Sequence, residues 1–134
     1  MTTKENYELQ AAKWSKGTQM GMSTDKASTT PNYTVKNVEL VVAGADVQAR
    51  IFTLAPGEFI PWHYHSESTD HYFVLRGTLS VRTRAPDEEH MLDVGNRHQI
   101  MPGTAHLISN RGTTDCVFLL LQGVGKYDWL KPKG

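Results

Sequence analysis

Residues 57–77 read GEFIPWHYHSESTDHYFVLRG, and this stretch decides the fold. His63 and His65 are two residues apart in it, and side chains at i and i+2 of a β-strand project from the same face, roughly 7 Å apart. Two imidazoles at that spacing can converge on one metal ion. Transition metals such as zinc accept imidazole nitrogens at about 2.0–2.1 Å and often add a carboxylate. A third ligand then has to come from another strand, and His106, in the stretch PGTAH of residues 102–106, is the candidate.

Glycines and ligand-type residues recur at set intervals in this stretch and after it. The first set is Gly57, His63, His65, Asp70 and Gly77, and the second is Gly95, Met101, Pro102, Gly103, His106 and Asn110. These two sets resemble the first and second motifs of the cupin family. Only Met101 breaks the second motif, where the family usually has proline. The combined spacing is far more specific than a single His-x-His pair, and the chain is identified as a single-domain cupin.

The strand pattern agrees with this resemblance. From Tyr33 onward, short β-branched and aromatic runs are broken by turn residues, which is typical of an all-β sandwich or barrel. We expect strands at residues 38–42, 47–54, 59–65, 70–76, 78–84, 90–92, 98–101, 106–109 and 117–122. Such short strands favour a double-sheet jelly roll. The expected fold is therefore an all-β, double-stranded β-helix (jelly roll) cupin barrel with a ligand cavity at its mouth.

The chain divides into two parts by composition. Residues 1–32 are rich in Thr, Ser and Lys and show no strand pattern, so we expect a flexible or loosely docked N-terminal arm. The alternative is an arm that packs across a partner subunit through Tyr7 and Trp14. Residues 33–134 form the expected cupin barrel domain.

Asp70 is the main departure from the family pattern, because the resemblance implies a glutamate as the fourth ligand at this position. Aspartate is one methylene shorter, which withdraws the carboxylate by about 1.5 Å. Three interpretations stay open: Asp70 binds the metal through a shifted backbone, it holds a metal-bound water, or it leaves a three-histidine site. Glu67 is a reserve ligand, although a solvated loop position suits it better.

Alternation along the strands supplies candidates for a substrate pocket. Tyr72 shares a face with Asp70 and becomes one of them. Arg50 and Phe52 alternate on the preceding strand and would present a cation and an aromatic wall, unless Arg50 lies on the outer sheet. His98 is a further candidate, because a polar residue at a position that is commonly apolar in the family can line the cavity.

The opposite faces of these strands bear on assembly. If His63 points inward, Trp62 and Tyr64 point outward, and their apolar surfaces need a cover. A homodimer interface is one such cover, and the resemblance to small cupins implies the same assembly.

Composition bounds the partners and the compartment. Fourteen basic and fourteen acidic residues give a formal net charge of zero, so we expect a small-molecule ligand and neither nucleic acid nor an anionic membrane as partner. The single cysteine, Cys116, lies in an apolar run, which predicts a buried structural thiol and no disulfide within the chain. There is no apolar stretch of the roughly 18 residues that a membrane span needs and no secretion signal. We expect a cytoplasmic protein.

The predicted site binds one divalent transition metal, and iron, manganese, nickel, cobalt and zinc all accept these ligands. Open coordination positions allow the ion to bind dioxygen and an enolate or to polarise a carbonyl. In the family that the chain resembles, these chemistries correspond to dioxygenases and to isomerases, epimerases and cyclases. The hypothesis is a metalloenzyme for a small aromatic or enolisable substrate. The alternative is a non-catalytic cupin that binds or senses a small molecule.

Overall fold

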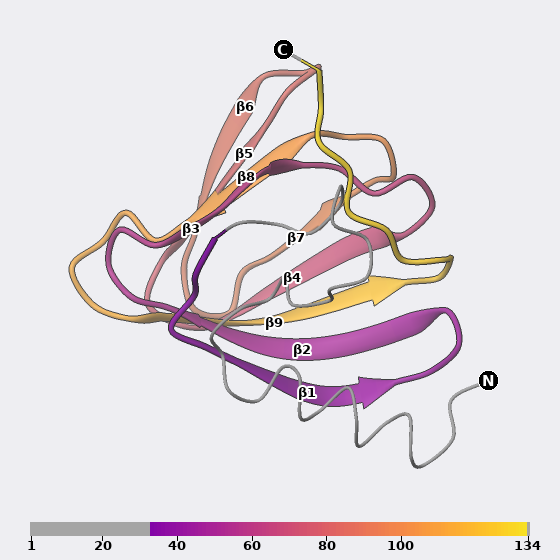
Figure 1. The fold of residues 1–134 in the computed structure, drawn as a ribbon. Coiled ribbons are helices and arrows are strands. Elements are labelled where there is room, and N and C mark those ends of the chain that lie inside the picture. The colour runs from indigo at the N-terminus through magenta and orange to yellow at the C-terminus, as the bar shows by residue number, and fades with distance from the viewer. Residues whose placement is uncertain (1–32, 134) are drawn as a thin grey trace.

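Two antiparallel β-sheets lie face to face in the computed structural model, which describes residues 33–133 (Figure 1). The first sheet has the strand order β1-β2-β9-β4-β7 and the second has the order β3-β8-β5-β6. The strands are β1 Asn37–Ala43, β2 Val47–Leu54, β3 Phe59–His63, β4 Thr69–Arg76, β5 Leu79–Thr83, β6 Glu88–Leu92, β7 Arg97–Ile100, β8 His106–Ser109 and β9 Cys116–Gly123.

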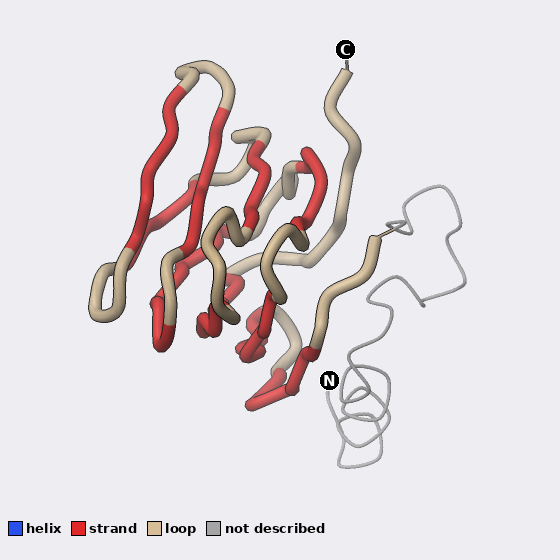
Figure 2. The backbone as a smooth tube through the Cα atoms, turned by 90° about the vertical axis from the view of Figure 1, so that its left-hand side faces the viewer, coloured by secondary structure: helices blue, strands red, loops and turns tan. Residues whose placement is uncertain are grey.

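This architecture confirms the predicted all-β jelly roll. Every expected strand is present, and its ends lie within two residues of the expected ones. Within the described part of the chain all regular structure is strand, as Figure 2 shows, and no helix there is long and apolar enough to cross a membrane. The predicted arm at residues 1–32 lies outside the described residues, so that division stays a prediction.

The core lies between the two sheets because alternate residues of each strand turn inward. The burial pattern of β9, in which buried and half-buried residues alternate without a break, illustrates this period of two. Phe52 of β2 and Phe118 of β9 stack with their ring centroids 5.2 Å apart, and Tyr72 of β4 lies 5.7 Å from Phe118. Each fully buried side chain of this size stabilises the fold by about 1.5–3 kcal/mol.

Strand register brings polar residues together at one end of this core. Asp70 of β4 pairs with Gln122 of β9, which in turn pairs with Gln48 of β2. In the second sheet His63 of β3 pairs with His106 of β8. Directly paired residues in an antiparallel sheet project from the same face, so each sheet contributes a polar row to the interior.

A β-bulge in β3 aims His63 inward. The register between β3 and β8 shifts between Ile60 and His63, which both point inward. Two residues, Pro61 and Trp62, lie between them, whereas a regular strand has one residue between two that point inward. Proline suits a bulge because it has no N–H to give to the ladder. The bulge also frees the carbonyl of Pro61, which accepts a hydrogen bond from the His63 ring at 2.7 Å.

Candidate metal centre

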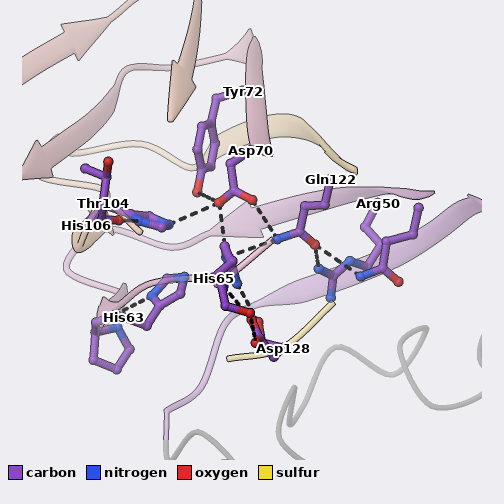
Figure 3. Close-up of polar contacts among 12 residues, drawn as sticks. Arg50, His63, His65, Asp70, Tyr72, Thr104, His106, Gln122 and Asp128 are labelled. Atoms are coloured by element: carbon purple, nitrogen blue, oxygen red, sulfur yellow. Dashed lines mark hydrogen bonds and ion pairs between the residues drawn. The ribbon is translucent and has the colours of Figure 1, made fainter. Parts of the chain in front are cut away.

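Four residues with metal-ligating side chains meet between the sheets: His63, His65, Asp70 and His106. We call them the His–Asp cluster, and Figure 3 shows their side chains pointing toward one another. Each offers one ligand atom, and these atoms all lie within 4.8 Å of one another. The cluster is buried, with exposed fractions of 3% for His63 and His65, 0% for Asp70 and 1% for His106. Side chains with this much polarity are buried only where partners satisfy them.

The backbone orients all three imidazole rings in the same way. The Nδ1–H of His63 donates to the Pro61 carbonyl at 2.7 Å, and that of His106 donates to the Thr104 carbonyl at 2.8 Å. The Nδ1–H of His65 donates to the carbonyl of Asp128, 63 residues further along the chain, at 2.5 Å. Because a carbonyl oxygen only accepts, each Nδ1 must carry a proton. A neutral ring then presents a lone pair at Nε2, which is the arrangement that a metal-binding histidine needs.

Asp70 faces two of these Nε2 atoms. Its Oδ2 lies 3.1 Å from His106 Nε2 and 3.3 Å from His65 Nε2. A carboxylate oxygen and an imidazole lone pair are both acceptors, so contacts this short require a cation between them. A proton on the imidazoles or a metal ion held by both residues meets that requirement.

The Asp70 carboxylate is also held by donors from its own sheet. The Tyr72 hydroxyl donates to Oδ2 at 2.8 Å, and the Gln122 amide donates to Oδ1 at 2.9 Å. The other end of Gln122 accepts a hydrogen bond from the Arg50 guanidinium and one from Gln48 at 3.2 Å. Figure 3 shows this line from Asp70 through Gln122 to Arg50. The carboxylate is therefore fixed in the orientation that faces the histidines.

The local electrostatics favour an ionised carboxylate beside imidazoles. Burial, followed by the neighbouring charges of His106 and His65, holds the pKa of His63 well below its ordinary value. Burial alone would raise the pKa of Asp70, but the hydrogen bonds with His106 and His65 outweigh it and hold that pKa well below its usual range. Burial and then the Asp70 charge raise the pKa of Tyr72 well above its ordinary value. Tyr72 therefore stays a neutral phenol that donates to the carboxylate.

The cluster fits a single transition-metal ion. Two ligands of one ion at about 2.1 Å lie at most about 4.2 Å apart, so the 4.8 Å spread of the donor atoms closes around an ion with sub-ångström shifts. Three imidazoles and one carboxylate suit iron, manganese, nickel and zinc, and they leave positions open on an ion that takes more than four ligands. The group can thus bind a metal.

Comparison with known families decides the classification. The family model described as "Cupin domain" matches residues 50–122, more than half of the chain. The chain is a cupin. No curated protein matches it.

Solved structures support the same fold for this cupin. An uncharacterized conserved protein with a double-stranded beta-helix domain from Klebsiella pneumoniae is 21% identical, with 77% of this chain and 85% of that chain covered and a TM-score of 0.62. KdgF from Halomonas sp. is 19% identical, with 64% and 76% covered and a TM-score of 0.59. An oxalate oxidase in complex with glycolate is 21% identical, with 64% of this chain and 46% of that chain covered and a TM-score of 0.59.

Of the candidate pocket residues, Tyr72 and Arg50 are linked to the cluster by hydrogen bonds, whereas Phe52 is not. Tyr72 contacts the cluster directly, and Arg50 reaches it through Gln122. Arg50 is only 1% exposed, so its alternative position on the outer sheet is wrong. Phe52 packs in the core, with the Arg50 guanidinium 5.1 Å from its ring.

His98 has a different environment. Its ring lies 4.4 Å from that of His90, across the neighbouring edges of the two sheets. Burial and then the His90 charge lower the pKa of His98. Its contact is therefore with His90, and the structure does not bring it to the cluster.

The outer surface of the barrel bears on two expectations, the dimer interface over Trp62 and the position of the ligand cavity. Trp62 does lie on the outer face, but the guanidinium of Arg84, 4.0 Å from its ring centroid, covers it within the same chain. Trp62 therefore gives no separate reason for a dimer. A shallow hollow of about 470 Å³ lies on the outside of the barrel, over Phe59, Leu107 and Arg111, and not at the cluster.

Sequence reasoning missed Gln122 and Asp128, which both form hydrogen bonds to residues of the cluster. The sequence predicts Gln122 only as the end of the last strand, although an amide after the apolar run of residues 116–121 is a signal that it needs a buried partner. Asp128 lies beyond every motif, and nothing in the sequence pairs it with His65. The reserve ligand Glu67 is exposed and accepts a hydrogen bond from the Lys126 N–H at 3.2 Å, so it does not join the cluster.

Proposed function

We propose that this cupin binds one divalent transition metal through His63, His65 and His106, with Asp70 as the fourth ligand. The observation that carries the proposal is the common orientation of the rings: every Nδ1–H is bound to a backbone carbonyl, which leaves the Nε2 atoms for an ion. The contacts of 3.1 and 3.3 Å between Asp70 and two of these nitrogens support a shared cation.

The proposed activity is that of a metalloenzyme for a small aromatic or enolisable organic substrate, of the dioxygenase type or the isomerase or cyclase type. When bound, iron, manganese, nickel or zinc would supply a Lewis acid with open coordination positions. The chain's own residues supply the rest. Tyr72 holds a proton at its hydroxyl, 2.8 Å from Asp70, and Arg50 brings a positive charge to the same end of the barrel.

This positive charge supports an acidic or enolate ligand, because a cation near the metal stabilises an oxyanion. The structural neighbour in complex with glycolate is an oxalate oxidase, and small hydroxy and dicarboxylic acids therefore join aromatic and enolisable compounds as the first compounds to screen.

The burial of the cluster favours a second candidate function. Its ligands are at most 3% exposed, which suits retention of an ion better than rapid exchange of a substrate. In this alternative the cupin binds or senses a small molecule without turning it over, and the metal serves as the anchor.

The first experiment is elemental analysis of natively purified protein beside a His63→Ala, His106→Ala double variant. A near-stoichiometric metal in the wild type that is lost in the variant supports the site, and equal metal content in both contradicts it. Steady turnover of any screened compound by the loaded wild type, absent in the variant, supports the enzyme. Saturable binding without turnover supports the alternative.

We also propose a homodimer in the cytoplasm, as the family resemblance and the sequence suggest. The outer face of the five-stranded sheet supports the dimer, because Ile51, Leu119 and Phe73 lie side by side there across three strands and are partly exposed. Light scattering of a Leu119→Asp variant beside the wild type tests this: a dimer that becomes a monomer supports the interface, and an unchanged mass contradicts it.

A further inference from the structure

The segment after β9 completes the His–Asp cluster. We call Lys126–Leu130 the C-terminal segment; it lies beyond residues 50–122, which the family model matches. Figure 1 shows the chain leaving β9, in the five-stranded sheet, and passing toward the end of the four-stranded one. The segment is irregular apart from one β-bridge, in which Leu130 pairs with Tyr64, between the two histidines of β3 and its extension.

Asp128 holds the second histidine of the His-x-His pair by two routes. Its carbonyl accepts the hydrogen bond from His65 Nδ1 at 2.5 Å. Its carboxylate accepts from the backbone N–H of Ser66 at 2.8 Å and from the Ser66 hydroxyl. His65 lies past the end of β3, where no neighbouring strand in the described part of the chain pairs with it. These bonds and the two Tyr64–Leu130 backbone bonds, at 2.9 and 3.0 Å, fix the backbone there in place of strand pairing.

Trp129 holds the first histidine. Its ring stacks on His63 with the centroids 4.8 Å apart and the planes within 9° of parallel. Tyr33 lies on Trp129 in turn, with centroids 6.3 Å apart. Trp129 is only 7% exposed although it lies in a loop. A flat, buried contact of this kind limits the rotation of the His63 ring about its Nδ1 hydrogen bond.

His106 has no such dependence on the segment. Its Nδ1 partner is the carbonyl of Thr104, two residues away in its own loop. The Nδ1 hydrogen bond of His106 is therefore an internal control. A change in the C-terminal segment should loosen His65 and His63 and leave this bond in place, although the His106 ring itself lies 4.2 Å from the His63 ring.

We propose that Asp128 and Trp129 are positioning residues of the metal centre, so that this cupin's metal affinity depends on a segment outside the cupin motifs. The proposal deepens the function proposed above and rests on it where it concerns the metal. Residues that only orient metal ligands typically change metal affinity 10- to 100-fold when they are removed.

Cobalt(II) is the probe, because its visible absorption reports the number and geometry of its ligands. We expect Asp128→Ala and Trp129→Ala to bind Co²⁺ about 10- to 100-fold more weakly and with an altered visible spectrum. Asp128→Asn keeps an oxygen acceptor for the Ser66 N–H, and Trp129→Phe keeps a ring on His63, so both should restore most of the affinity. Trp62→Ala is the matched control, since it removes an equal ring next to His63 in sequence but on the outer face.

A second readout needs no metal. Histidine ¹⁵N NMR of the metal-free protein reports the Nδ1–H tautomer and its proton exchange for each ring. We expect Asp128→Ala to release the C-terminal segment and speed exchange at His65 Nδ1, and Trp129→Ala to shift the His63 signals, while the Nδ1–H of His106 keeps its tautomer and its exchange rate. Circular dichroism identifies any variant that fails to fold, and the two conservative variants then carry the comparison.

The two proposals fail separately. If the wild type binds no Co²⁺ but the variants change the histidine spectra as expected, the metal function fails and the positioning role stands. If the wild type binds Co²⁺ and both alanine variants keep its affinity, visible spectrum and histidine signals, the positioning role is overturned. No binding together with unchanged histidine signals overturns both.

Discussion

Replacement of Asp70 by alanine tests whether its carboxylate ligates the ion directly. Two ligands at about 2.1 Å from one ion are about 3.0 Å apart when they subtend a right angle and about 3.4 Å apart at the tetrahedral angle. The distances from Asp70 Oδ2 to His106 and His65 Nε2, 3.1 and 3.3 Å, fall inside this interval. A carboxylate that only held a metal-bound water would be separated from these nitrogens by the width of that water. The geometry therefore accommodates direct ligation, and the variant tests it against the other two interpretations of Asp70.

The expected loss follows from this geometry. Removal of a charged ligand should exceed the 10- to 100-fold effect of a residue that only orients ligands, and we expect at least about 1,000-fold weaker binding, or about 4 kcal/mol. Asp70→Asn, which keeps the volume but loses the charge, should fall in the same range. Asp70→Glu should also weaken binding, because the aspartate already lies at ligand distance and an added methylene extends the side chain by about 1.5 Å.

Competition with a chromogenic chelator at constant pH and salt measures these affinities. Asp93→Ala is the control, since Asp93 is an exposed aspartate that accepts a hydrogen bond from Thr78 far from the cluster in the fold. An Asp70→Ala protein that folds and binds metal within tenfold of the wild type would refute direct ligation and leave the three-histidine site.

Two further predictions concern the barrel. An alanine Cβ at Gly77 (φ +78°) would lie 2.5 Å from the Asp115 carbonyl oxygen, whereas one at Gly95 (φ +91°) would meet nothing within 4 Å. Both pay about 1–2 kcal/mol for a left-handed backbone, and the clash adds about 1–3 kcal/mol at Gly77 alone, so urea unfolding should show a larger loss for Gly77→Ala; equal losses would contradict the packing. Burial raises the pKa of the Cys116 thiol from 9.0 to about 11, which lowers its thiolate fraction near neutral pH about 100-fold. The native protein should therefore resist thiol reagents that label the urea-unfolded chain at one site, and rapid labelling of the native protein would place Cys116 at the surface.

Local pattern was enough to predict the strands and the face of most site residues. Asp70 and Tyr72 are two apart on one strand, and the structure places both inward and in contact, as alternation requires. The strand ends followed from turn residues, such as Gly77 and Gly95, whose positive φ angles a glycine adopts without strain. These features depend on residues that are close in sequence, and so they can be inferred without knowledge of strand pairing.

The bulge before His63 was beyond such inference. A plain strand from Phe59 to His65 and the observed strand to His63 with a bulge both turn the two histidines inward. They differ in where the Pro61 carbonyl points, and that decides the tautomer of His63. Only the pairing of β3 with β8 distinguishes them, and that pairing is a property of the folded sheet.

The contacts of Gln122 and Asp128 with the cluster could not be predicted from the sequence. A polar side chain at the end of an apolar strand indicates that it needs a buried hydrogen-bond partner, but many groups can satisfy an amide. The partner of Gln122 is Asp70 because the register between β4 and β9 pairs these two residues. Asp128 contributes a backbone carbonyl to His65, and every residue type has one. The identity of position 128 therefore carries information only through its carboxylate, which ties the segment to Ser66. A motif can specify which atoms ligate a metal, whereas the rigidity of those atoms depends on contacts that the motif does not contain. We therefore expect metal affinity to vary among proteins that have the same motifs but different terminal segments.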